Sequence, residues 1–159
     1  MKLTTINKKF RQGIYKPINT TKYRGNDYPR FLSSWELKLF RWCDANDDVL
    51  EWSSEGIIIP YSNPITEKTS SYFPDVAIKM KVGNDVKKFL VEIKPFRETI
   101  DPKTLDRGRK KQKTIIYENL NYIKNQAKWN AAKKWCKKMG YEFTILTEKE
   151  LGIYKYSNK

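Results

Sequence analysis

Apolar residues recur at helical spacing in two stretches of the chain. The first begins at Ser33 or Ser34 and runs through Cys43, with a stripe formed by Leu32, Trp35, Leu39 and Trp42 or Cys43. The second covers about residues 109–139, with Ile115 or Ile116, Leu120, Ile123, Ala127 and Ala131 on one face, and Gly140 follows it. This spacing gives each stretch one apolar face, and glycine commonly ends helices, so we predict two helices that cover a sheet.

Four other stretches have the composition of β-strands, namely Ile57–Tyr61, Tyr72–Met80, Val86–Lys94 and Tyr141–Leu146. Pro60 lacks an N–H and therefore places the first strand near an edge or at a bulge. The Gly83-Asn84 pair predicts a hairpin, which makes the second and third strands antiparallel neighbours. A capping-box pattern at Thr147 to Glu150 predicts a short last helix. The element order favours an α/β domain with one mixed sheet flanked by helices.

Residues 1–30 are polar and lack a clean helical or alternating period. They hold eight basic side chains against one acidic one, Asp27. We interpret this segment as a basic N-terminal arm and residues 31–159 as one domain, because 159 residues are enough for a single core.

The net charge of +14 indicates a polyanionic partner, and DNA is the leading candidate. Residues 103–138 are the second basic region, with twelve Lys and Arg against Asp106 and Glu118. The alternative is that both regions are only solvated surface. The side chains that we expect to contact phosphates are Lys8, Lys9, Arg11, Arg107, Arg109, Lys110, Lys111 and Lys113.

The residue types that are absent or rare exclude several classes of site. The chain contains no histidine, which removes Cys/His zinc fingers and Ser-His-Asp hydrolases. Its two cysteines, Cys43 and Cys136, do not make a disulfide framework and fit a reducing cytoplasm as small buried hydrophobes. No apolar run approaches the length of a signal peptide or a membrane span, so we expect no membrane partner.

Acidic and basic side chains interrupt the second and third predicted strands. Residues two apart in a strand point to the same face, so Glu92 and Lys94 project together, and Asp75 lies across from them on the neighbouring strand. Two close carboxylates repel each other, and Mg²⁺ between them is the natural compensation, with the Ile93 carbonyl as a further ligand. A surface ion pair is the alternative interpretation.

Such a metal site has a defined chemistry toward a phosphodiester. A cation on Asp75 and Glu92 polarises a phosphoryl oxygen and acidifies a bound water. Lys94 then orients that water or helps to deprotonate it, and stabilises the charge of the transition state. The pattern therefore favours a metal-dependent nuclease.

Pro74-Asp75 with Glu92-Ile93-Lys94 resembles the PD-(D/E)XK signature of restriction-endonuclease-like folds. Over about residues 30–150 the chain is more closely similar to the TnsA endonuclease catalytic domain, and within it to the head completion nucleases of T-even-like tailed phages. The segments that carry this resemblance are Ser33–Glu36, Asp48-Val49, Ile57–Tyr61, Tyr72–Asp75, Leu90–Pro95 and Trp135–Glu148. The transposon enzyme has glutamine where Glu92 stands, so this chain follows the broader nuclease pattern there.

The resemblance implies a restriction-endonuclease-like mixed sheet and a DNA endonuclease that uses Mg²⁺, or alternatively Mn²⁺. It also implies an acidic metal ligand on the first helix, a position that Glu36 occupies. The other interpretation of Glu36 is structural, because Ser33 to Glu36 is also a capping box.

The phage relatives imply a role in processing DNA ends or branched DNA when a filled head is completed. The expected partners are then DNA and the head or portal proteins, in the host cytoplasm and in the virion. Two alternatives stay open: a non-catalytic DNA-binding virion protein on a nuclease scaffold, and a restriction or repair nuclease. The oligomeric state stays open as well.

Overall fold

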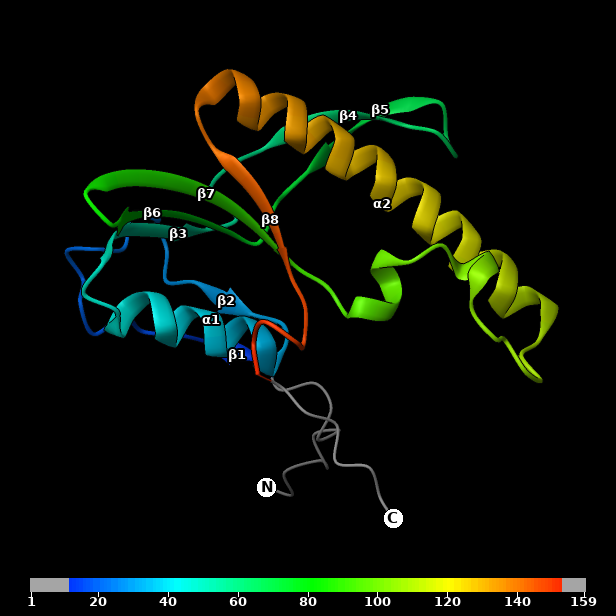
Figure 1. Ribbon diagram of the computed structural model, residues 1–159, viewed down its shortest axis with the longest axis horizontal. Coiled ribbons are helices and arrows are strands. Elements are labelled where there is room, and N and C mark those ends of the chain that lie inside the picture. The colour runs from blue at the N-terminus through cyan, green and yellow to red at the C-terminus, as the bar shows by residue number, and fades with distance from the viewer. Residues whose placement is uncertain (1–11, 153–159) are drawn as a thin grey trace, which may run out of the picture.

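A four-stranded mixed sheet forms the centre of the protein, which a computed structural model describes over residues 12–152 (Figure 1). Its spatial order is β3-β6-β7-β8. The first three strands pair antiparallel, and β8 lies parallel to β7. The bounds are β3 Val49–Ser54, β6 Val76–Val82, β7 Asp85–Ile93 and β8 Glu142–Leu146. The predicted α/β class with a mixed sheet between helices is confirmed.

The predicted hairpin joins β6 to β7. Val82 pairs with Asp85, which leaves Gly83 and Asn84 as a two-residue turn. Gly83 has φ +62°, in the left-handed region that glycine reaches without steric cost. The turn fixes the register of the two strands and brings Val76 opposite Val91. The two ends that lead to Asp75 and Glu92 are therefore neighbours.

A long crossover connects β7 to the parallel strand β8. It contains two short 3₁₀ helices, η1 Phe96–Thr99 and η2 Pro102–Thr104, and then helix α2, Gln112–Met139. Gly140 ends α2 with φ +79°, as its position in the sequence predicted. No helix within residues 12–152 is both long and apolar enough to cross a membrane.

The helices α1 (Ser34–Ala45) and α2 lie on opposite faces of the sheet (Figure 1). Alternate residues of β7 serve the two faces: Val91 packs in the core under α1, whereas Leu90 packs with residues of α2. Cys43 and Cys136 are buried free thiols, one in each core, in agreement with their interpretation as small hydrophobes. Burial raises the pKa of the Cys43 thiol to about 12.

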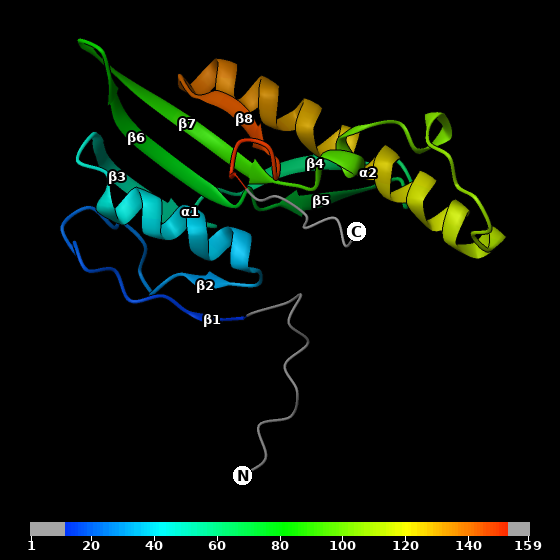
Figure 2. The same ribbon diagram turned by 60° about the horizontal axis from the view of Figure 1, so that its bottom comes forward.

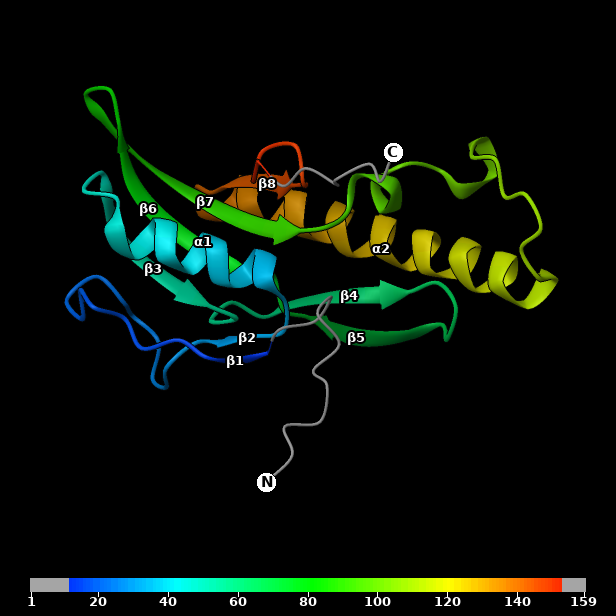
Figure 3. The same ribbon diagram turned by 90° about the horizontal axis from the view of Figure 1, so that it is seen from below.

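Two strand predictions were wrong in detail. Ile57–Tyr61 was expected in the main sheet, but β4 (Ile59–Asn63) pairs with β5 (Lys68–Tyr72) in a separate two-stranded ribbon. The ribbon runs beside α2 and extends away from the sheet (Figure 3). The predicted strand Tyr72–Met80 is interrupted at residues 73–75, because Pro74 cannot donate to a ladder. The chain passes there from the ribbon into the sheet.

The predicted last helix is absent from the described residues. The capping contacts exist, since Glu150 Oε2 accepts from the Thr147 main-chain N–H at 2.7 Å and from its hydroxyl. The chain forms only turns from residue 148 to residue 152, however, and the described part ends there.

Residues 12–30 pack against α1 and β3. Two two-residue strands, β1 (Gly13–Ile14) and β2 (Arg30–Phe31), pair antiparallel in this segment. The Asp44 carboxylate, 2% exposed, accepts from the Tyr15 hydroxyl at 2.6 Å and from the main-chain N–H groups of residues 18 and 19. Three hydrogen bonds to one buried carboxylate attach this segment to the end of α1.

Candidate active site

Glu92 and Lys94 stand at the end of β7 and point to the same side of the sheet. The Lys94 Nζ atom lies 3.8 Å from Glu92 Oε1. Ile93, between them, packs in the core under α1. The alternation of strand side chains therefore directs Glu92 and Lys94 toward the face that α2 and the β4–β5 ribbon occupy.

Asp75 stands at the break between β5 and β6 and reaches the same end of β7. Its Oδ2 atom accepts a hydrogen bond of 2.6 Å from the Ile93 main-chain N–H. Its own carbonyl accepts from the N–H of Glu55 at 3.0 Å, which holds the break against the end of β3. Asp75 therefore lies next to Glu92 and Lys94, as the hairpin register predicted.

The two carboxylates oppose each other's ionisation. Burial raises the pKa of Asp75, and the charge of Glu92 raises it further, against the N–H of Ile93. Burial also raises the pKa of Glu92, which is 7% exposed, whereas the Tyr72 hydroxyl and the Lys94 ammonium lower it. The negative charge of the two carboxylates is thus incompletely balanced. A cation beside their oxygens would offset both the cost of burying the charges and the repulsion between them.

Glu36 lies in the first turn of α1, whose N-terminal end approaches the carboxyl end of β7 (Figures 2 and 3). Its Oε2 atom accepts from the Leu32 N–H at 3.0 Å, and its own N–H donates to Ser33 Oγ at 3.2 Å. Burial raises the pKa of Glu36, and the Lys94 ammonium lowers it. The capping role of Glu36 is therefore present. Its carboxylate is also close enough to Lys94 for the ammonium charge to affect its pKa.

The oxygen atoms at this end of β7 suit a hard cation. Within residues 12–152, no three side chains among Asp, Glu, Cys and His lie close enough together to hold a metal ion as a group. Mg²⁺ in proteins is commonly held by only one or two carboxylates, with water and substrate phosphate completing its shell. Asp75 and Glu92, with the Ile93 carbonyl, fit that donor set.

Tyr72 contacts this site and was not predicted to do so. Its hydroxyl donates to Glu92 Oε2 at 2.6 Å. Burial and the charge of Glu92 raise the pKa of Tyr72, so the phenol stays protonated as a donor. The sequence placed Tyr72 at the start of a strand but held no signal of this contact, because the partner is 20 residues away.

Lys128 of α2 is the second residue that the sequence analysis missed. Its Nζ atom lies 5.6 Å from the ring centre of Tyr72 and 5.9 Å from that of Tyr61. In the structure Lys128 lies between the buried residues Asn125, Trp129 and Ala132, so a lysine occupies the inner side of the helix. The sequence did not indicate this side, because Leu120 and Ile123 of the predicted apolar face are exposed.

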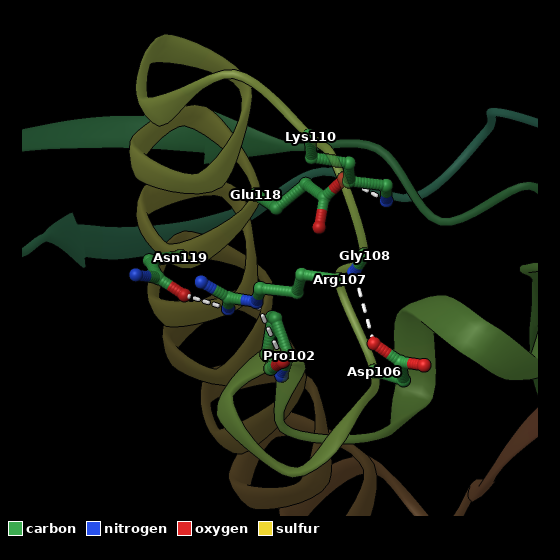
Figure 4. A network of polar contacts seen from close by, with 7 residues as sticks. All are labelled: Pro102, Asp106, Arg107, Gly108, Lys110, Glu118 and Asn119. Carbon is green, nitrogen blue, oxygen red and sulfur yellow. Dashed lines mark hydrogen bonds and ion pairs between the residues drawn. The ribbon is translucent and has the colours of Figure 1, made fainter.

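The candidate DNA-contacting residues fall into three groups. Lys8, Lys9 and Arg11 lie outside the described residues. Arg107 and Lys110 are engaged: Arg107 bonds the Pro102 carbonyl and the Asn119 side chain, and Lys110 pairs with Glu118 (Figure 4). The remaining three are exposed and form no ion pair with any residue from 12 to 152: Arg109, Lys111 and Lys113.

Comparison with known proteins agrees with this geometry. Residues 46–148 match the family described as TnsA-like endonuclease N terminal, a span that contains Asp75, Glu92 and Lys94. The chain is also 36% identical over 140 residues to the head completion nuclease of Enterobacteria phage T4, which covers 86% of this chain and 90% of that protein. Both matches cover most of the fold, and the family match includes Asp75 and Glu92. The chain therefore belongs to the TnsA-like endonuclease N-terminal family.

Proposed function

We propose that the protein is a Mg²⁺-dependent DNA endonuclease whose active site consists of Asp75, Glu92 and Lys94. Mn²⁺ is the alternative cation. The observation that supports this proposal is the convergence of two buried carboxylates and one ammonium at the end of β7. A scaffold that only binds DNA has no need to keep two repelling acidic groups in a buried place.

The residues of the chain have separate roles in the proposed reaction. Asp75 and Glu92, with the Ile93 carbonyl, hold the metal, and Glu36 supplies additional negative charge. The bound metal supplies Lewis-acid polarisation of the phosphoryl group and a more acidic water. Lys94 donates hydrogen bonds to the attacking water or to a non-bridging oxygen, and its charge stabilises the added negative charge of the transition state.

Glu92 also positions Lys94, through the 3.8 Å contact with its ammonium. Water attacks phosphorus and gives up one proton to solvent while the opposite P–O bond breaks, and the leaving oxygen takes up a proton from solvent. The exposed Arg109, Lys111 and Lys113, with the arm residues Lys8, Lys9 and Arg11, are proposed to hold neighbouring phosphates.

The biological role follows from the relative that is named as a head completion nuclease. We infer that this protein acts in phage head completion, where it processes DNA ends or branched DNA after packaging. Phage head or portal proteins are then its further partners, in the host cytoplasm and in the virion.

A plasmid assay tests the enzymatic proposal. Supercoiled plasmid is incubated with the protein in Mg²⁺ or in EDTA, and nicked circles are quantified. We expect nicking only with the metal, and a loss of at least about 100-fold in Asp75→Asn and Lys94→Ala, because each removes a group that acts on the transition state.

Matched controls are Asp85→Asn and Lys81→Ala, which remove the same charges from exposed positions around the β6–β7 turn. Both should nick as the wild type does. If Asp75→Asn and Lys94→Ala bind DNA and also nick at the wild-type rate, or if no protein nicks at all, the binding-only alternative replaces the enzyme.

A further inference from the structure

Helix α2 presents Lys128 toward the acidic site, and Lys124 lies one turn before it. Lys124 and Lys128 are four residues apart and therefore lie on the same side of the helix. Both are partly buried, whereas Lys133, Lys134, Lys137 and Lys138 of the same helix are exposed. The two inner lysines thus differ from those that only face solvent.

Lys128 is held in place by aromatic rings. Its ammonium lies over Tyr72 and Tyr61 at 5.6 and 5.9 Å, within the range of cation–π attraction. Tyr72 is itself fixed by its hydrogen bond to Glu92. The ammonium of Lys128 is therefore held beside the acidic pair. Because its position is already restricted, binding an anion there would cost little additional side-chain entropy.

The ammonium groups of Lys124 and Lys128 are not balanced by ion pairs within residues 12–152. Burial lowers the pKa of Lys128, and the ammonium groups of Lys124 and Lys94 lower it further, against the charges of Glu92 and Asp75. Across residues 12–152, neither Lys124 nor Lys128 forms an ion pair with a carboxylate. Glu92 takes its close contacts from Lys94 and Tyr72 instead.

We propose that Lys124 and Lys128 form a second phosphate-binding subsite, on α2, for a DNA backbone phosphate next to the one that is cleaved. The inference rests on the proposed function, because it takes DNA as the substrate. It adds that the strand passes from the end of β7 to the partly buried lysines Lys128 and Lys124 of α2. A backbone phosphate supplies the anion that these ammonium groups lack.

The test is DNA binding without metal, so that no cleavage occurs. Binding of a fluorescein-labelled duplex is measured by anisotropy in EDTA over a range of salt concentrations, for wild type, Lys128→Met and Lys124→Met. Methionine keeps much of the apolar stem. We expect each variant to bind about five- to ten-fold more weakly at about 0.1 M salt, with a slope of log affinity against log salt reduced by about 0.9.

Lys133→Met is the matched control, because it removes one charge from the exposed side of the same helix. It should weaken binding less than about two-fold, since screening at this salt suppresses the effect of a distant charge. Lys128→Arg should bind as the wild type does. Thermal unfolding of each variant shows whether it is folded. If Lys128→Met does not fold, the binding of Lys124→Met decides whether the subsite exists.

Equal losses of DNA affinity in Lys128→Met, Lys124→Met and Lys133→Met would overturn the subsite, because they would show that only the net positive charge of the protein matters. Unchanged binding of Lys128→Met and Lys124→Met together with slower nicking would also overturn it, because these lysines would then act on Glu92. The proposed function fails separately: wild type that does not nick in Mg²⁺ discards the enzyme, even if both lysines control DNA binding.

Discussion

The phenolic hydroxyl of Tyr72 donates a 2.6 Å hydrogen bond to Oε2 of Glu92, and so joins the end of the β4–β5 ribbon to the end of β7. The bond stabilises the ionised carboxylate in a site where burial disfavours it. The phenol thereby opposes the rise that burial causes in the pKa of Glu92, the carboxylate that we propose as a metal ligand.

Replacing Tyr72 with Phe should raise the pKa of Glu92 further, because the phenol is one of the groups that oppose the effect of burial, and only the nearby lysines would remain. The acidic limb of the pH profile for nicking should move to higher pH. A hydrogen bond to a charged group contributes about 1.5 kcal/mol or more, so we expect about ten-fold slower nicking below neutrality. Recovery at high pH separates this role from misfolding, and a profile that keeps its midpoint would contradict it.

Asp75→Asn should stabilise the metal-free protein at pH 7. The raised pKa of Asp75 means that the wild type loses free energy of unfolding as pH rises above the ordinary aspartate value of about 3.9. We expect a gain of about 1 kcal/mol, or about 2–4 °C in Tm, at pH 7, and none near pH 3. The exposed variant Asp85→Asn should show no such gain.

In Mg²⁺ the wild type should become more stable than Asp75→Asn, because the ion binds the folded wild type. At ten times its dissociation constant the ion adds about 1.4 kcal/mol. Asp75→Asn should gain much less. The measurement is calorimetry with and without Mg²⁺, and equal shifts for both proteins would place the metal elsewhere.

Glu36→Gln separates the two interpretations of Glu36. Glutamine keeps an oxygen for the Leu32 N–H, so thermal stability should change by less than about 1 kcal/mol. Nicking should fall at least about ten-fold, because a negative charge near the metal is lost. Ser33→Ala is the opposite control: it removes the cap, costs about 1 kcal/mol, and should leave nicking intact in the folded protein. Full activity of Glu36→Gln would leave only the capping role.

Asp44→Asn should loosen the packing of residues 12–30. Burial on its own would raise the pKa of Asp44, but the hydrogen bonds from Tyr15, Ile18 and Asn19 outweigh it and lower the pKa. An amide cannot accept all three, so we expect a loss of about 2–4 kcal/mol in urea unfolding at pH 7. Because the folded pKa is lowered, this stabilisation exists above about pH 3.9 and disappears as pH falls through the folded value. Asp47→Asn, at an exposed position, should cost little by comparison.

Much of the fold was predictable because local patterns determine it. The Gly83-Asn84 turn and the helix-ending Gly140 are each specified by a few neighbouring residues. The stripe predicted for α1 was right only in part: Leu39 and Cys43 are buried, whereas Leu32 and Trp42 are exposed and Leu37 and Phe40 are buried instead. The strand β3 was missed, since its sequence, Val-Leu-Glu-Trp-Ser-Ser, has half its positions polar although Val49 and Trp52 are buried. The strand β5, Lys-Thr-Ser-Ser-Tyr, is almost wholly polar and depends on pairing with β4.

The candidate site was predictable where the hairpin register alone brings residues together. Asp75, Glu92 and Lys94 meet because a two-residue turn fixes the alignment of β6 and β7. Tyr72 and Lys128 join them through the packing of the ribbon and α2, which no local pattern encodes. The apolar face predicted for α2 gave no signal of Lys128, because Leu120 and Ile123 of that face are exposed and the buried positions are Asn125, Trp129, Ala132 and Cys136.

The passage from ribbon to sheet has a mechanical consequence. Only Phe73 and Pro74 separate Tyr72, the last residue of the ribbon, from Asp75 at the entry to the sheet. A tilt of the ribbon would displace both carboxylates at once, Asp75 along the chain and Glu92 by way of the phenol. The spacing of the acidic oxygens therefore depends on how the β4–β5 ribbon is oriented relative to the sheet.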